Sequence, residues 1–287
     1  MGLKHPAERL GEVAVNTRVS LVLPLLAALL LPGTASAATP ASVQHALAQA
    51  IAGPQRSPAH VARDRYRHPL RTLEFFGIRP DMTVVEVLPG GGWYTEILAP
   101  FLREHGTLIE ATPPSGPMAA RFKTKLADDP AVYDRVRTTP FAPPDSMVLG
   151  PPDSADMILT FRNMHDFMYE NVHGEETDAI LMRFFRSAFH TLKPGGVLGV
   201  VAHRAPTDMA PRDAFKLGRL PQAFLVAAAE RAGFKLAAAT EINANRKDPR
   251  TEPVWFLPPT LARGPADHYA AIGEADNMTL RFVKPQR

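Results

Sequence analysis

Apolar and polar positions along the chain follow two periods in turn. Short β-branched runs, such as Thr83 to Val87, have the length and composition of buried strands, and amphipathic stretches with helical spacing follow them. Strands that alternate with helices predict an α/β fold, with a mostly parallel sheet that carries helices on both faces. The predicted strands lie at residues 83–87, 106–111, 135–139, 155–160, 197–202, 234–240 and 278–283. The clearest predicted helices lie at residues 41–51, 69–76, 118–126, 175–192 and 221–232.

The N-terminal segment has a different pattern, with basic residues ahead of a short apolar run. Lys4, Arg9 and Arg18 precede Val19 to Leu31, and the small residues Ala35 to Ala37 follow. These are the parts of a secretory signal peptide, and the apolar run is shorter than the roughly 20 residues of a spanning helix. We expect cleavage near Ala37, a periplasmic or secreted protein, and no stable membrane insertion after cleavage. An uncleaved anchor or a misplaced start is the alternative.

This pattern divides the chain into three parts. Residues 1–37 are the predicted signal peptide, 38–82 a predicted N-terminal helical extension or lid, and 83–287 the predicted α/β domain. Residues 243–276 are rich in proline and asparagine, and their pattern predicts no element.

The composition argues against several kinds of partner and site. The chain has 32 basic and 29 acidic residues, a balance that does not favour a nucleic-acid partner. It has no cysteine, which excludes disulfides, thiolate nucleophiles and cysteine-based zinc sites. His165, Asp166 and His173 do not have a recognised metal-ligand spacing, so no metal site is predicted.

The turn after the first predicted strand carries most of the candidate chemistry. The strand contains Glu86 and runs into Gly90, Gly91 and Gly92, and a helical pattern follows at once. Glycines at such a turn let a nucleotide-like ligand approach the backbone at the carboxyl end of a strand. The dinucleotide motif G-x-G-x-x-G is incomplete because Thr95 stands at its third glycine, which argues against a nicotinamide cofactor. No Gly-Lys-Ser/Thr follows, so the turn is not a P-loop.

Here the sequence resembles the class I S-adenosylmethionine-dependent methyltransferases, and within them a subgroup of exported predicted methyltransferases. The resemblance covers roughly residues 83–284, and the first glycine of the family motif is Leu88 in this chain. It implies a Rossmann-like, doubly wound sheet of seven strands whose last strand is antiparallel. The matching segments are Glu86-Val-Leu-Pro-Gly-Gly-Gly92, Gly90 to Pro100, Ala155 to Thr160, Leu192-Lys-Pro-Gly-Gly-Val-Leu198 and Ala228 to Phe234.

The resemblance implies S-adenosylmethionine as the cofactor. Glu86 would meet its ammonium group, or else hold the turn by a structural hydrogen bond. Glu110, at the end of the second strand, would accept from the ribose hydroxyls, or else be a solvated strand end. Phe141 would stack on adenine, with core packing as the alternative. The complete set of predicted cofactor-binding residues is Glu86, Leu88, Pro89, Gly90, Gly91, Gly92, Glu110, Phe141, Phe161 and Arg162.

The segment after the fourth strand supplies the predicted catalytic residues. Methyl transfer needs an aligned acceptor and, where the acceptor carries a proton, a base. We expect His165 to be that base and Asp166 to orient it or to bind substrate. The alternative is that Asp166 caps a helix beginning at Phe167 and that His165 is solvated. The predicted substrate-binding residues are Tyr94, Asn163, His203 and Arg204.

A basic cluster, residues 63–71, precedes the first strand. Its spacing indicates a solvated face, although a lid that supplies a cation to an anionic substrate would have the same composition.

The predicted function is therefore S-adenosylmethionine-dependent methyl transfer to a small molecule. Export conflicts with a cofactor made in the cytoplasm, so a non-catalytic module that binds an adenosine-like ligand is the second hypothesis. A nicotinamide-dependent oxidoreductase is the third. The sequence does not indicate the oligomeric state.

Overall fold

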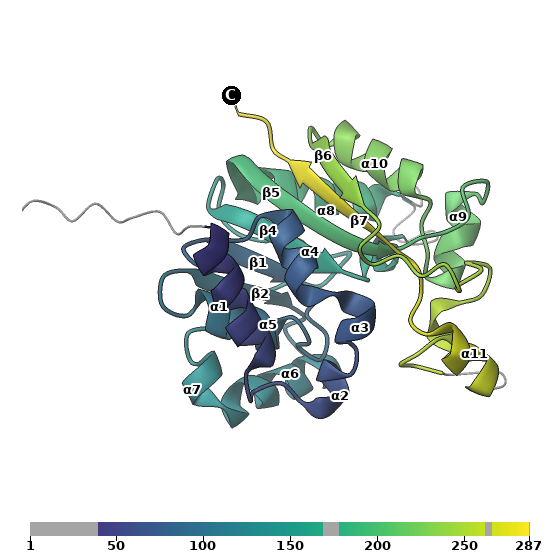
Figure 1. Cartoon of the computed structure of the whole chain (residues 1–287). Coiled ribbons are helices and arrows are strands. Elements are labelled where there is room, and N and C mark those ends of the chain that lie inside the picture. The colour runs from purple at the N-terminus through teal and green to yellow at the C-terminus, as the bar shows by residue number, and fades with distance from the viewer. Residues whose placement is uncertain (1–39, 169–177, 262–265, 287) are drawn as a thin grey trace, which may run out of the picture. The chain divides into compact units, whose positions relative to one another are not determined.

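The computed structural model describes residues 40–168, 178–261 and 266–286, and its framework is one seven-stranded sheet (Figure 1). The strand order is β3-β2-β1-β4-β5-β7-β6, so the order reverses between β1 and β4. β7 is antiparallel to β5 and β6, and the other pairs are parallel. The strands are β1 Thr83–Val87, β2 Thr107–Thr112, β3 Arg137–Pro140, β4 Ala155–Phe161, β5 Leu192–His203, β6 Lys235–Thr240 and β7 Asn277–Val283.

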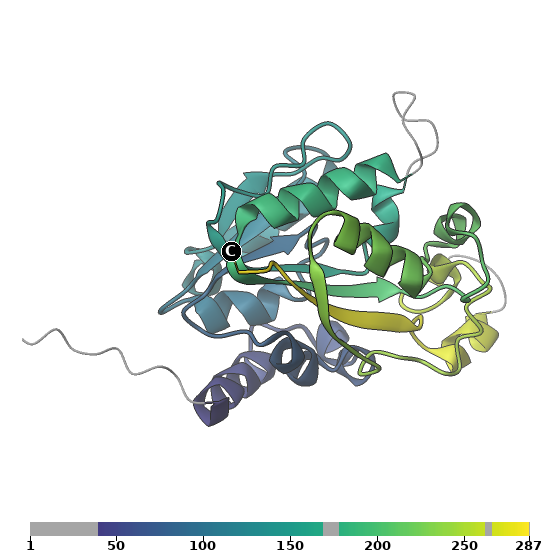
Figure 2. The same cartoon turned by 90° about the horizontal axis from the view of Figure 1, so that it is seen from above.

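Helices cover both faces of the sheet, and Figure 2 shows α8 and α10 in green on one face and α1 in purple on the other. The α-helices are α1 Pro40–Ala52, α2 Pro58–Val61, α3 Asp64–Arg67, α4 Pro69–Phe76, α5 Thr95–Leu102, α6 Pro117–Asp128, α7 Pro130–Tyr133, α8 Ala179–Thr191, α9 Pro211–Ala214, α10 Gln222–Arg231 and α11 Ala266–Ile272. Short 3₁₀ helices are η1 Met164–Phe167, η3 Phe215–Leu217 and η4 Val254–Phe256.

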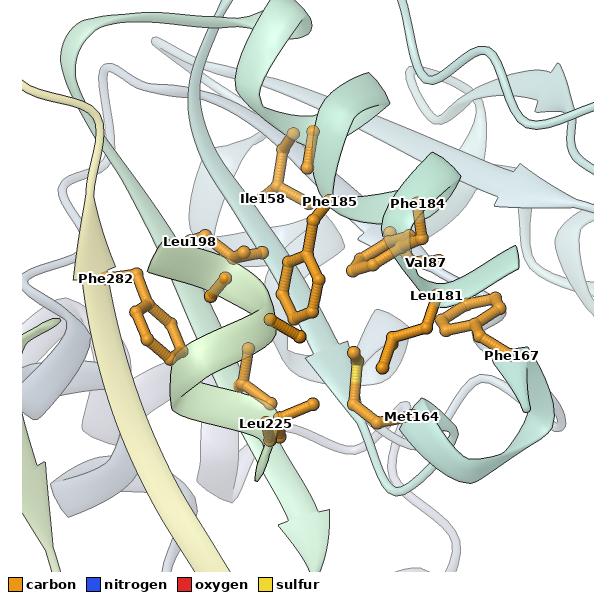
Figure 3. Close-up of a cluster of buried hydrophobic side chains, with 14 of the residues drawn as sticks. Val87, Ile158, Met164, Phe167, Leu181, Phe184, Phe185, Leu198, Leu225 and Phe282 are labelled. Atoms are coloured by element: carbon orange, nitrogen blue, oxygen red, sulfur yellow. The ribbon is translucent and has the colours of Figure 1, made fainter. Parts of the chain in front are cut away.

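Alternation along β1 sends successive side chains to opposite faces of the sheet. Val85 and Val87 join the core beneath α8 and α10, whereas Val84 joins the core beneath α1, α4 and α5. Figure 3 shows the first of these cores, in which Phe184 and Phe185 of α8 pack against the strands. Glu86 has the same parity as Val84, so its carboxyl group points toward α5.

The structure confirms the α/β class, the seven strands and the antiparallel last strand. Each predicted strand lies within a few residues of the observed one, except that β5 begins at Leu192 rather than Val197. The pattern missed the four-residue helices α2, α3, α7 and α9, because one helical turn is too short to show a period. The segment 243–276, which had no predicted element, contains η4 and α11.

Residues 38–287 form one compact unit, in which α1 packs on α5 and the predicted extension is part of a helical layer. The predicted signal peptide, residues 1–37, lies outside the described residues, and its cleavage and export stay predictions. Among the described residues, none of the helices has the length and apolar character to cross a membrane.

A buried ion pair fixes the long segment between β6 and β7. The guanidinium of Arg219 and the carboxylate of Asp248 are fully buried and pair through two hydrogen bonds, at 2.8 and 3.1 Å. Asp248 also accepts from the backbone N–H of Asp276 and of Arg250. The Asp248 carboxylate thus joins two points of this segment, Arg250 and Asp276, to Arg219 ahead of β6.

We expect Asp248→Ala to lower the free energy of unfolding by about 3–5 kcal/mol, because it leaves the buried Arg219 charge unpaired. Urea denaturation of wild type and variant measures this. Asp81→Ala is the control, because that exposed carboxylate pairs only with Arg79 at 3.3 Å and its loss should cost less than about 1 kcal/mol. A loss for Asp248→Ala as small as for the control would contradict the bracing role.

Candidate functional site

The turn between β1 and α5 keeps its backbone open to a cavity. Leu88, Gly90 and Gly92 have φ values of +52°, +59° and +76°, so the turn is left-handed at three positions. A Cβ added to Gly90 or Gly91 would meet no atom within 4 Å, whereas one added to Gly92 would meet Lys125 at 2.8 Å. Gly90 and Gly91 therefore face open space, and Gly92 is covered by α6.

The cavity beside this turn, here called the turn cavity, has a volume of about 440 Å³. The turn residues 88–91 form one wall, and Phe161, Arg162 and Asn163 at the end of β4 form another. Trp93 also borders it, with its indole N–H bonded to the carbonyl of His60. Neither Leu88 nor Trp93 fills the space. The cavity lies where the strand order reverses, which is where α/β sheets place ligands.

A hydrogen bond beneath the turn ties the strand to the helix. The Thr95 hydroxyl donates to the Glu86 carboxylate at 3.0 Å, and both side chains are buried. Thr95 thus stands at the third glycine of a dinucleotide motif and uses its side chain to bond the strand. The structure places Glu86 in the structural alternative predicted for it, holding the turn.

Glu110 lies next to Glu86 on the neighbouring strand, because the two residues are partners in the parallel register of β1 and β2. Burial raises the pKa of Glu86 to about 7. Burial also raises the pKa of Glu110 well above its usual range, and the nearby Glu86 charge adds to this. Both oxygens of Glu110 are buried without a hydrogen-bond partner among the described residues. Glu110 is therefore not the solvated strand end that was its alternative interpretation, and it lines neither cavity.

A second cavity of about 360 Å³ lies beyond Arg162, here called the histidine cavity. His165 and His203 line it with ring centroids 5.7 Å apart, and Trp255 of η4 forms part of its wall. Burial lowers the pKa of His165, and burial together with the charge of His165 holds the pKa of His203 well below its usual range. Both imidazoles are therefore neutral at neutral pH.

Arginines separate the two cavities. Arg63, Arg67 and Arg162 border both of them. Glu274, just ahead of β7, accepts from Arg63 at 2.6 Å and from Arg67 at 3.1 Å. We call these four residues the arginine cluster.

Solved structures match this chain at the level of the fold. A SAM-dependent methyltransferase from Aquifex aeolicus is 15% identical over 79% of this chain and 94% of its own, with a TM-score of 0.53. Geranyl diphosphate C-methyltransferase from Streptomyces coelicolor A3(2), solved with S-adenosyl-L-homocysteine, is 16% identical over 82% of this chain and 87% of its own, also at 0.53. The [4+2]-cyclase SpnF is 19% identical over 85% of this chain and 93% of its own, at 0.51.

The chain has the S-adenosylmethionine-dependent methyltransferase fold. No protein-family model matches the sequence, and no curated protein matches it either. In this methyltransferase fold the turn cavity and the histidine cavity lie side by side, and Arg63, Arg67 and Arg162 border both.

Several predicted residues lie at these cavities. Leu88, Pro89, Gly90, Gly91, Phe161, Arg162, Asn163 and Asp166 border the turn cavity, and Arg162, His165 and His203 border the histidine cavity. The carboxylate of Asp166 lies 3.3 Å from Nε2 of His165. Asp166 is inside η1, which begins at Met164, so it does not cap a helix at Phe167.

Asn163 and Tyr94 have structural contacts in the methyltransferase fold. The Asn163 amide donates to the carbonyl of Val87 at 2.8 Å and accepts from the Thr160 hydroxyl, which joins the ends of β1 and β4. The Tyr94 ring stacks on Phe161 with centroids 3.5 Å apart, and its side chain is buried. Tyr94 therefore supports a wall of the turn cavity and does not line it.

Phe141 and Arg204 border neither cavity. Phe141 is fully buried and packs edge to face on Phe167, so the structure places it in core packing, the alternative predicted for it. Arg204 bonds Glu241 and Asp276 through four hydrogen bonds and borders neither cavity. Its guanidinium holds the chain around β5 and β7, and a substrate contact is not supported.

The sequence analysis missed Glu274 and Trp255. It favoured a solvated face for the basic cluster that contains Arg63 and Arg67, because its spacing looked mixed, and gave a cation for an anionic substrate as the alternative. Arg63 and Arg67 are nevertheless four residues apart, at the start and end of α3, and lie on one face. That spacing was the available signal. Glu274 and Trp255 come from the segment without a predicted element, and no local pattern marks them.

The buried Glu86 predicts a pH-dependent stability. Its pKa is about 7 in the fold and 4.5 for an unperturbed glutamate, so the folded state holds this proton more tightly than the unfolded chain does. The resulting stability is complete below pH 4.5 and is lost as pH rises through about 7, with a loss of up to about 3 kcal/mol.

We expect Glu86→Gln to reduce the fall of unfolding free energy between pH 5 and 8, measured by denaturant titration at each pH, and the buried Glu110 accounts for the fall that remains. Thr95→Val is the control, because it removes the hydrogen bond and keeps the carboxyl group. That variant should be less stable and should retain the pH dependence. Wild type and Glu86→Gln with the same slope would show that Glu86 is not the titrating group.

Proposed function

We propose that this protein transfers a methyl group from S-adenosylmethionine to a small molecule. The observation that carries the proposal is the open space above Gly90 and Gly91, at the position where the strand order reverses. The methyltransferase fold supports it. The same fold occurs in a protein described as a cyclase, so the proposal rests on the site as well as on the fold.

The turn cavity fits the cofactor because Gly90 and Gly91 have no side chains and leave open the space that a side chain would occupy. A ligand can therefore lie against their backbone. The backbone of Leu88 to Gly91 would hold the amino-acid portion, and Phe161 would border it from the end of β4. Pro113 and Met118, beyond β2, line the same cavity and extend it toward α6. When bound, S-adenosylmethionine supplies a methyl group already activated by a sulfonium centre.

The histidine cavity suits the methyl acceptor. A neutral His165 can donate from one ring nitrogen to Asp166 and accept a proton at the other. His165 would remove the proton of an acceptor whose nucleophilic atom carries one, and Asp166 would fix the tautomer. His203 faces the same space and would orient the acceptor.

We expect Gly91→Val to abolish binding of S-adenosylhomocysteine, measured by calorimetry, without a large change in Tm. The valine side chain would point into open space, so it should block the ligand and leave the packing intact. The smallest loss of affinity that would agree with this expectation is about tenfold, or 1.4 kcal/mol.

Gly92→Val is the contrasting variant. At this residue φ is +76° and a Cβ would meet Phe122 and Lys125, so we expect a lower Tm as well as weaker binding. Wild type that binds neither S-adenosylmethionine nor S-adenosylhomocysteine would refute the methyltransferase proposal. Undiminished binding by Gly91→Val would place the cofactor elsewhere.

A further inference from the structure

Arg162 is a buried cation whose hydrogen bonds are not made. Its side chain is 9% exposed, and among the described residues none of its three guanidinium nitrogens has a hydrogen-bond partner. The residue has φ +65°, an uncommon conformation for a side chain of this size, and it borders both cavities. A guanidinium does not lose its proton in a protein, so this charge needs an anion.

The carboxylate nearest to Arg162 is already engaged. Glu274 lies 3.9 Å from Nε of Arg162, beyond hydrogen-bond distance, and its two oxygens accept from Arg63 and Arg67. Three guanidinium groups therefore share one carboxylate. Burial, and after it the charge of Arg162, lowers the pKa of Arg67 to about 9, which leaves Arg67 charged at neutral pH.

The other titratable groups do not offset this charge. His165 and His203 face the histidine cavity as neutral rings. Asp166 borders the turn cavity with a largely exposed side chain and pairs with His165. The histidine cavity thus contains an excess of two positive charges over Glu274.

We propose that the methyl acceptor carries a carboxylate or phosphate group, which Arg162 binds together with Arg63 and Arg67 in the histidine cavity. Guanidinium groups bind both anions through paired, charge-assisted hydrogen bonds. The proposal rests on the methyltransferase function proposed above. It adds the class of substrate, an anionic small molecule whose nucleophilic atom lies near His165.

S-adenosylmethionine has a carboxylate of its own, which is the competing partner for these arginines. Two observations favour the acceptor. His203 lies in the histidine cavity alone, and its Nδ1 is also buried without a partner among the described residues. A cavity with an unpaired cation and an unpaired imidazole has polar groups for a second ligand, separate from the one above the glycine turn.

The test is calorimetric titration of the whole protein, saturated with S-adenosylhomocysteine, with inorganic phosphate and separately with malonate at constant ionic strength. We expect one of them to bind, and the stronger ligand shows which anion the site takes. Arg162→Gln should weaken that binding at least about tenfold, the cost of one charge-assisted hydrogen bond. Its affinity for S-adenosylhomocysteine should fall by a smaller factor than its affinity for the anion, because Arg162 also borders the turn cavity but the backbone of the turn would hold the cofactor.

Arg65→Gln is the matched control. Arg65 is exposed, lies over the Tyr66 ring and borders neither cavity, so its loss removes the same charge without touching the site. Should Arg162→Gln have a lowered Tm, Arg63→Gln gives a second measurement, because its half-buried side chain borders the same cavity.

The outcomes separate this inference from the function on which it rests. Loaded wild type that binds neither anion would overturn the inference and leave cofactor binding intact. Competition between phosphate and S-adenosylhomocysteine would also overturn it, because the arginines would then hold the cofactor carboxylate. If the protein binds an anion but no S-adenosylhomocysteine, the anion site exists but is not a site for a methyl acceptor, and the inference fails together with the proposed function. Equal losses in Arg162→Gln and Arg65→Gln would show a non-specific charge effect.

Discussion

The hydrogen bond from Thr95 to Glu86 is the interaction on which the site depends. It lies under the turn that joins β1 to α5, so it fixes the direction in which the helix leaves the strand. The turn can then pass over the carboxyl edge of the sheet with Gly90 and Gly91 open to the turn cavity. Asn163 secures the opposite wall by joining the ends of β1 and β4. The open space is thus held by a hydrogen bond beneath the turn and by Asn163 in its wall.

Charge imposes the second constraint. Arg63 and Arg67 come from α3, Arg162 from the end of β4, and Glu274 from the chain ahead of β7. Arginines so close together repel one another, and one carboxylate offsets only part of that repulsion. The fold tolerates the cluster because the buried pair of Arg219 and Asp248 anchors the segment that leads to Glu274. The unpaired guanidinium of Arg162 borders both cavities.

The fold was largely predictable from sequence because the strands and the long helices each show a hydrophobic period in this single sequence. The turn at Gly90 and Gly91 was also predictable, because three consecutive glycines after a β-branched run are a local signal. Glu274 and Trp255 were not predictable, because only the tertiary fold brings these two residues of the segment to the histidine cavity. The role of Phe141 was left open between adenine stacking and core packing, and Arg204 was assigned to the substrate. Position at a strand end does not show whether a side chain finds partners in the fold, as Phe141 does with Phe167 and Arg204 does with Asp276.

A shared fold does not determine the reaction, since a protein described as a cyclase and two described as methyltransferases all match this chain in fold. What distinguishes proteins of one fold is the chemistry of the second cavity, because there the partner of the cofactor must be held. In this chain that cavity contains two neutral imidazoles beside an unpaired guanidinium. An imidazole can accept a proton only while it is neutral. Burial lowers the pKa of His203 most, and Arg162 and Arg67 lower it further, so the same cations that would attract an anion help to keep this imidazole neutral.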